Sequence, residues 1–247
     1  MLNNDGSVIT DNWNGFSARV GTMCDREFVV VFPKEGTANG KWAIKTEYFG
    51  AFPDAEIELL NRGYHLCGIK TKTRWCLDED TEAQAELARY MHEELGLSEK
   101  GVPVGMSCGG QQAIFLAAKH PELVSCMYID APVVNYLSCP AGLGMKGGGM
   151  LDEFTKARGI SLSELLSFRK HPLDYIPKLI EYNIPVLLLS GDSDTVVPFE
   201  ENGALLKKAY EEAGCTIETI MRPGADHHPH GLPDVTPICD FIDKYSY

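Results

Sequence analysis

The sequence predicts an α/β protein built on a mostly parallel, doubly wound sheet with helices on both faces. Two observations predict this class: short apolar runs alternate with amphipathic helical patterns, and 247 residues with 44% hydrophobic content suffice for one sizeable core. Strands joined through helices run parallel, and such sheets carry their chemistry at the carboxyl ends of the strands. The expected strands cover residues 26–32, 64–69, 102–106, 126–129, 186–189 and 216–221.

Start and stop signals delimit the expected helices. Thr81 and Gln84 form a capping box in which both side chains can satisfy backbone N–H groups, and Gly96 ends this first helix. His120-Pro121 stops the second helix, because the residue before a proline is pushed out of the helical region. The expected helices cover residues 81–95, 111–119, 201–213 and 237–245.

The alternation of strands and helices fails between residues 136 and 184. A glycine-rich stretch at 141–149 is followed by short helical patterns, one of which opens with a capping box from Ser161 to Glu164. Because the leucines of this segment need a place to bury, we expect it to fold over the sheet as a lid or cap. The prediction is one domain over residues 1–247 with a lid insertion at 136–184.

Charge and composition exclude several function classes. Lys plus Arg is 22 against 35 for Asp plus Glu, and a net charge of −13 disfavours nucleic-acid and membrane partners. The sequence contains no stretch of 18 apolar residues, the length that a helix needs to cross a bilayer. The first residues show neither a basic region nor an apolar core, and the eight cysteines are scattered, so we expect a cytoplasmic protein with reduced thiols.

The run Gly105-Met106-Ser107-Cys108-Gly109 fits the G-x-S-x-G pattern of a nucleophile elbow. A short apolar strand precedes it and a helix follows, which is the context that such a turn requires. The turn holds the serine in strained backbone geometry and projects its hydroxyl above the sheet. Ser107 is therefore the candidate nucleophile.

A serine hydroxyl needs a base to take its proton and an acid to orient that base. Asp194 follows the apolar strand at 186–189, at the same edge of the sheet, although Asp192 competes with it. Three histidines, His227, His228 and His230, crowd the turn after the last expected strand. The residues alone leave open which of them is the base.

The order serine, aspartate, histidine matches that of α/β-hydrolases. Over nearly its full length the chain resembles an α/β-hydrolase of the esterase type, in particular bacterial carbohydrate-esterase-like members with a His-His-Pro-His-Gly-Leu signature. The matching pieces are Trp13-x-Gly15-Phe16, Val30-Val31-Phe32-Pro33-Lys34, Glu47-x-Phe49-Gly50, the elbow, Asp130-Ala131-Pro132, the run from Gly191 to Pro198, and His227-His228-Pro229-His230-Gly231-Leu232.

This resemblance implies roles for particular residues. The acid is the second aspartate of such a Gly-Asp-x-Asp run, which favours Asp194, and the base follows a Pro-Gly turn, which favours His227 over His228 and His230. Two N–H donors should face the oxyanion. The resemblance implies the backbone of Cys108 for one and, from the loop between Pro33 and Trp42, the backbone of Glu35 for the other.

The sequence and the resemblance together predict a serine esterase that needs no cofactor and no metal. Its expected substrate is a small-molecule ester with a short acyl group such as acetyl, and acylated sugars are among the candidates. A serine peptidase of the prolyl-oligopeptidase type is the nearest alternative, since the same triad cleaves amides. Two alternatives belong to other classes: a metalloprotein with ligands among Asp226, His227, His228 and His230, and a non-catalytic binding protein with the hydrolase fold.

Overall fold

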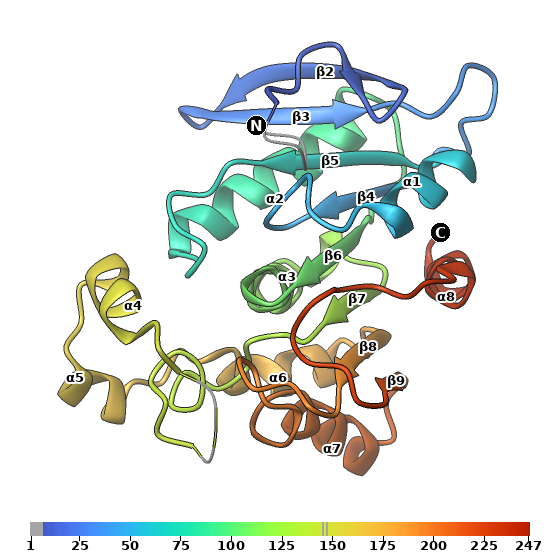
Figure 1. Ribbon diagram of the computed structural model, residues 1–247. Coiled ribbons are helices and arrows are strands. Elements are labelled where there is room, and N and C mark those ends of the chain that lie inside the picture. The colour runs from blue at the N-terminus through green and yellow to red at the C-terminus, as the bar shows by residue number, and fades with distance from the viewer. Residues whose placement is uncertain (1–6, 145, 147) are drawn as a thin grey trace.

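The computed structural model describes residues 7–144, 146 and 148–247, and these residues form one nine-stranded sheet (Figure 1). The strands lie in the order β1-β2-β3-β5-β4-β6-β7-β8-β9 across the sheet. Their bounds are β1 Asn12–Trp13, β2 Phe16–Met23, β3 Arg26–Val31, β4 Trp42–Lys45, β5 His65–Ile69, β6 Val102–Met106, β7 Met127–Asp130, β8 Val186–Gly191 and β9 Ile217–Arg222.

Strand direction divides the sheet into two parts. β1 pairs antiparallel with β2, β2 pairs antiparallel with β3, and β3 pairs antiparallel with β5. From β5 through β4, β6, β7 and β8 to β9 every pairing is parallel. The carboxyl ends of the parallel strands therefore share one edge, whereas β3 ends at the opposite edge.

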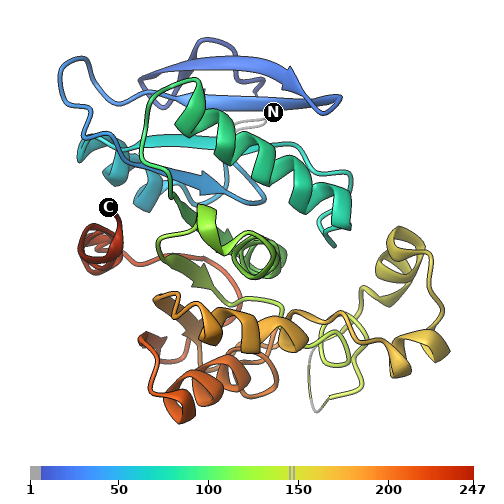
Figure 2. The same ribbon diagram turned by 180° about the vertical axis from the view of Figure 1, so that it is seen from behind.

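Helices cover both faces of the sheet, as the fold prediction requires. α1 (Asp54–Asn61) and α8 (Thr236–Tyr245) pack on one face. The other face carries α2 (Asp78–Glu93), α3 (Cys108–Lys119), α6 (Pro172–Glu181) and α7 (Gly203–Ala213), which Figure 2 shows from behind. The predicted α/β-hydrolase fold is confirmed. Within the described residues, no helix combines the length and apolar character needed to cross a bilayer.

Successive side chains of a strand face opposite sides of the sheet, and each side has its own hydrophobic core. In β3, Val30 faces the core under α2 and α3, while Val29 and Val31 face the core under α1 and α8. β6, β7 and β8 are buried over their whole length, because a parallel sheet with helices on both faces has no wet side. These rigid strands position the loops that follow them.

Two parts of the secondary-structure prediction were wrong or incomplete. The strands at 16–23 and 42–45 were not expected: β2 is half exposed, and β4 is short and contains a lysine. Helix α2 begins at Asp78, because the Asp80 carboxylate accepts the Leu77 N–H at 2.8 Å. Thr81 and Gln84 therefore lie inside the helix and do not cap it.

The segment at 136–184 contains three helices, which were expected there: α4 (Leu151–Arg158), α5 (Leu162–Ser167) and α6. Ser161 caps α5 as predicted, because it accepts the Glu164 N–H while the Glu164 carboxylate accepts the Ser161 N–H. α6 packs in the same layer as α3, but α4 and α5 project to the side of the molecule (Figure 1). The interpretation of this segment as a lid stays a prediction.

Candidate active site

The nucleophile elbow joins β6 to α3 at the carboxyl edge of the sheet. Ser107 has φ 53° and ψ −118°, a conformation that L-residues rarely adopt and that clusters at functional sites. Two glycines make the turn possible: a Cβ on Gly105 would lie 2.3 Å from the Gly109 carbonyl oxygen, and a Cβ on Gly110 would lie 2.5 Å from Pro132 Cβ. The elbow thus holds the serine in the strained geometry that the motif predicts.

Ser107, His227 and Asp194 meet in one hydrogen-bonded relay. The Ser107 hydroxyl lies 3.0 Å from His227 Nε2, and His227 Nδ1 lies 2.7 Å from Asp194 Oδ2. The Asp194 side chain is fully buried, and that of His227 is only 4% exposed. The residues come from the ends of β6, β8 and β9, so segments more than thirty positions apart converge above one edge of the sheet.

Asp194 is held so that one oxygen remains for the imidazole. Its Oδ1 accepts the N–H groups of Val196 at 2.9 Å and Val197 at 2.7 Å, while Oδ2 faces His227. The competing residue, Asp192, is exposed and accepts the Gly224 N–H at 2.7 Å. Asp192 therefore ties its turn to the histidine loop and does not touch an imidazole in any described contact.

A buried ion pair fastens the histidine loop to the sheet. Asp130, at the end of β7, pairs with Arg222 at 2.9 Å and accepts the Gly231 N–H at 2.6 Å. Arg222 also donates to the carbonyl oxygens of Pro229 and Gly231. Because both ends of the loop are held, His227 has little freedom to leave Ser107.

His228 and His230 lie beside His227 without replacing it. Their ring centroids are 4.6 Å and 4.9 Å from that of His227. His228 stacks on Phe52, and His230 meets the same ring edge-on. Among the contacts of the described residues, the imidazole that bonds to the Ser107 hydroxyl is that of His227.

Cys108 fits the first oxyanion donor, but its thiol has no place in the chemistry. It is the first residue of α3, so its N–H has no carbonyl partner within the helix. Burial raises the pKa of the Cys108 thiol to about 12, so the thiol stays neutral and a poor nucleophile near pH 7.

Glu35 was wrongly predicted as the second oxyanion donor. It follows β3, and because β3 is antiparallel to β5, its carboxyl end lies beside the start of β5, where Val31 pairs with Leu66. Ser107 lies at the other edge of the sheet, after β6. The error came from treating β3 as a parallel strand and from missing β4.

Tyr48, which sequence reasoning missed, follows β4 at the same edge of the sheet as Ser107. β4 and β6 pair with Lys45 opposite Val104, so a continuation of this register by three residues sets Tyr48 level with Ser107. Tyr48 has φ 52°, and its side chain lies beside Cys108 and Arg74. The available signal was the Glu47-x-Phe49-Gly50 piece of the resemblance, which flanks this tyrosine.

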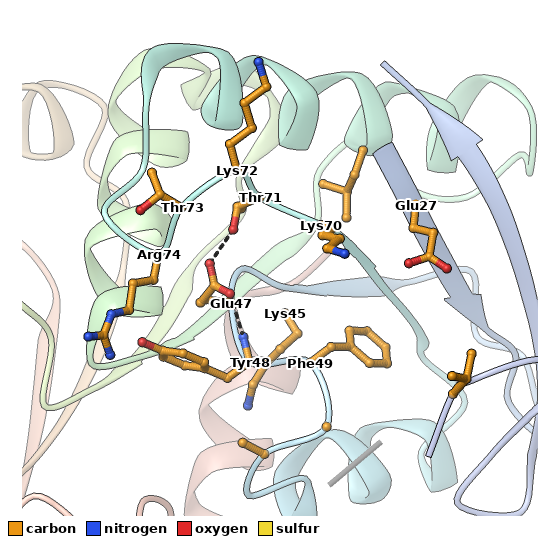
Figure 3. Close-up of a pocket in the computed structure, with 14 residues that line it drawn as sticks. Glu27, Lys45, Glu47, Tyr48, Phe49, Lys70, Thr71, Lys72, Thr73 and Arg74 are labelled. Atoms are coloured by element: carbon orange, nitrogen blue, oxygen red, sulfur yellow. Dashed lines mark hydrogen bonds between the residues drawn. The ribbon is translucent and has the colours of Figure 1, made fainter. Parts of the chain in front are cut away.

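A cavity of about 680 Å³ opens beside Tyr48 at the ends of β4 and β5 (Figure 3). Glu47 lies at its centre, where its carboxylate accepts the Thr71 hydroxyl and the Gln112 amide, each at 2.6 Å. Gln112 belongs to α3, the helix that begins after Ser107, so this hydrogen bond joins the cavity wall to the elbow. Figure 3 also shows the Tyr48 ring pointing toward Arg74.

The fold and the hydrogen-bonded relay of Ser107, His227 and Asp194 are those of an α/β-hydrolase. Residues 77–246 match the prolyl oligopeptidase family, so the chain belongs to that family, which consists of serine hydrolases. This match confirms the predicted α/β-hydrolase superfamily but does not support the resemblance to carbohydrate-esterase-like members. Of the functional alternatives, the comparison favours the peptidase over the esterase.

Several solved structures share the fold of this chain. One is the acylaminoacyl peptidase of Pyrococcus horikoshii, with a TM-score of 0.74 and 13% identity over 94% of this chain and 42% of that chain. Another is a puromycin hydrolase, with a TM-score of 0.69 and 17% identity over 87% of this chain and 36% of that chain. The chain thus spans about two fifths of the length of these proteins.

Proposed function

We propose that this chain is a serine hydrolase that cleaves the amide bond of short aminoacyl or peptidyl substrates through an acyl-enzyme on Ser107. The observation that carries the proposal is the relay from Ser107 through His227 to the buried Asp194. Membership of the prolyl oligopeptidase family and the likeness to an acylaminoacyl peptidase favour an amide substrate.

In the proposed reaction His227 Nε2 takes the Ser107 proton as the hydroxyl oxygen attacks the substrate carbonyl carbon. Asp194 holds Nδ1 protonated and stabilises the imidazolium that forms. His227 then protonates the leaving amine, the C–N bond breaks, and an acyl-enzyme remains. A water that gives its proton to His227 attacks this ester, and the acid leaves as Ser107 recovers its proton.

The Tyr48 hydroxyl completes the proposed oxyanion hole together with the Cys108 N–H. Burial raises the pKa of the Tyr48 phenol well above its ordinary value, so the phenol keeps its proton and can donate it in a hydrogen bond. Tyr48→Phe is therefore expected to lower kcat by about 10²- to 10³-fold with a smaller change in KM. Tyr90→Phe, on α2, where the ring packs against Phe28 of β3, is the matched control. A Tyr48→Phe enzyme with full kcat would remove the phenol from the mechanism.

Matched substrates test the bond that is cleaved. N-acetyl-aminoacyl p-nitroanilides and p-nitrophenyl esters with the same acyl groups would be compared through kcat/KM, with Ser107→Ala as the blank. The proposal expects amide cleavage that depends on Ser107. Turnover of acetyl esters with amide cleavage at the level of the blank would contradict it and support the esterase instead.

Hydrolysis of small acyl esters is the second candidate. The observation that favours it is the position of the esterase-like pieces: the His-His-Pro-His run carries His227, and the Glu47-x-Phe49-Gly50 piece borders the cavity. An acylated sugar with an acetyl group is the substrate that the resemblance suggests. p-Nitrophenyl acetate is therefore added to the substrate comparison above.

In this proposal the segment at 136–184 acts as a lid, and its helix α4 contacts the rim of the cavity at Arg74. Glu153 of α4 receives two hydrogen bonds from Arg74, which borders the cavity, and one from the Trp75 indole at 2.9 Å. Arg158 of α4 donates to the Trp75 carbonyl oxygen at 2.8 Å. We expect a covalent phosphonate on Ser107 to slow proteolytic cleavage within the segment at 136–184. Equal cleavage of labelled and free enzyme would count against a lid.

A further inference from the structure

Three imidazoles cluster beside the nucleophile, and the proposed reaction uses one of them. The ring centroids of His227, His228 and His230 are 4.6, 4.9 and 5.0 Å apart. One ring nitrogen from each residue lies within 4.8 Å of the other two. Imidazole is the side chain that most often binds Zn²⁺, and three imidazoles with one open position are a common donor set.

Two of these imidazoles have a carboxylate behind them. Asp194 lies 2.7 Å from His227 Nδ1, and Asp130 lies 3.5 Å from His230 Nδ1. The His230 nitrogen is buried and makes no hydrogen bond among the described residues. Metal-bound histidines are usually backed in this way, because the carboxylate orients the ring and raises the basicity of the other nitrogen. In His230 this arrangement leaves Nε2 for a ligand, whereas in His227 a metal would replace the Ser107 hydroxyl on Nε2.

We infer that His227, His228 and His230 form a binding site for a divalent transition metal of the Zn²⁺ class, and that occupancy switches the enzyme off. A metal on His227 Nε2 takes the lone pair that would accept the Ser107 proton, so the hydroxyl is no longer activated. The inhibitory half of the inference rests on the proposed function, whereas metal binding does not. The net charge of −13 favours cations near the protein.

Closure of the site needs a small movement. Zn–N bonds of about 2.0–2.1 Å in a tetrahedral site bring the nitrogens to roughly 3.4 Å from one another. His228 is the exposed member of the three, and Asp130 and Arg222 anchor the loop on either side of it. His228 therefore has the most room to move, while Asp194 and Asp130 hold the rings of His227 and His230.

Direct binding is the first measurement. Metal-stripped Ser107→Ala protein, full length, is titrated with ZnCl₂ by calorimetry and with CoCl₂ by visible absorption. The inference expects one ion per chain with the intense visible bands of a tetrahedral Co²⁺ site. His228→Ala and His230→Ala should each weaken binding by about 10- to 100-fold or more. Cys24→Ser, which removes the exposed thiol, and His92→Ala, on α2, should leave it unchanged.

Inhibition is the second measurement. Zn²⁺ is expected to inhibit the wild-type enzyme, a chelator should restore full activity, and the inhibition constant should rise in His228→Ala in step with the loss of binding. Zn²⁺ binding that survives in both His228→Ala and His230→Ala overturns the inference, because the ion then sits elsewhere, for example on a thiol. Activity that is lost on chelation and restored by Zn²⁺ also overturns it. Tight binding in a protein without hydrolase activity would overturn the proposed function and the switch but keep the site.

Discussion

Replacement of His227 by alanine is expected to lower kcat by about 10⁴- to 10⁶-fold, the loss that follows removal of the base from a serine triad. The reason is geometric: His227 Nε2 lies 3.0 Å from the Ser107 hydroxyl, and its other nitrogen is held by Asp194 at 2.7 Å. Steady-state kinetics on the best substrate of the matched panel measure the effect.

His228→Ala and His230→Ala are the matched controls for this change. They remove the same ring from the same loop, but neither ring bonds to Ser107 in the described contacts, so both variants should stay far more active than His227→Ala. Metal-free buffer is needed, so that differences in Zn²⁺ binding do not enter the comparison. A His230→Ala enzyme that loses more activity than His227→Ala would show that the base is assigned to the wrong histidine.

Glu56→Ala is expected to lower the free energy of unfolding by about 3–5 kcal/mol, a large part of the about 5–15 kcal/mol of a typical domain. Lys45 of β4 and Glu56 of α1 form an ion pair in which both side chains are 0% exposed. Removal of the carboxylate leaves a buried ammonium whose other contact is the Met106 sulfur at 3.4 Å. Urea denaturation followed by tryptophan fluorescence measures the change.

Two further variants separate burial of the charge from loss of a contact. Glu58→Ala, on the same helix, breaks a partly exposed pair with Arg62 and should cost no more than about 1 kcal/mol. The double change Lys45→Met with Glu56→Leu removes both charges and should recover most of the stability. If Glu56→Ala lowers the free energy of unfolding by less than about 1 kcal/mol, the Lys45 ammonium must be hydrated in the variant, which would contradict its burial.

The fold class was predictable because it depends on hydrophobic patterns that are visible within single strands and helices. Buried parallel strands such as Val186–Gly191 read as continuous apolar runs, and α8 has its apolar residues on one side. The elbow was predictable for a related reason, since its motif is local: a side chain at Gly105 would clash with the Gly109 carbonyl oxygen four residues on. The carboxyl ends of parallel strands share one edge of the sheet, which predicts that Ser107, Asp194 and His227 lie close together. The structure places them within hydrogen-bond distance.

What the sequence could not supply was strand direction and order. β4 has four residues, one of which is the buried Lys45, so its pattern resembles a loop. Its partner Glu56 is eleven positions away on α1, so the ion pair is visible only in the folded structure. With β4 missed, the sequence places the donor loop after β3 and predicts Glu35, whereas Tyr48 follows β4 at the edge that Ser107 occupies. The wrong prediction of a helix cap at Thr81 and Gln84 has a similar cause. The Gln84 side chain is buried because it donates a hydrogen bond to Gln112 of α3, a contact between distant parts of the sequence.

The central claim is that Ser107 is a nucleophile activated by His227 and Asp194. A fluorophosphonate probe, which reacts only with an activated hydroxyl, tests it most directly when peptide mapping follows the reaction. We predict one adduct per chain, located on Ser107, retained in Cys108→Ala and strongly slowed in His227→Ala. An adduct on another residue, or labelling of Ser107→Ala at the wild-type rate, would contradict the account.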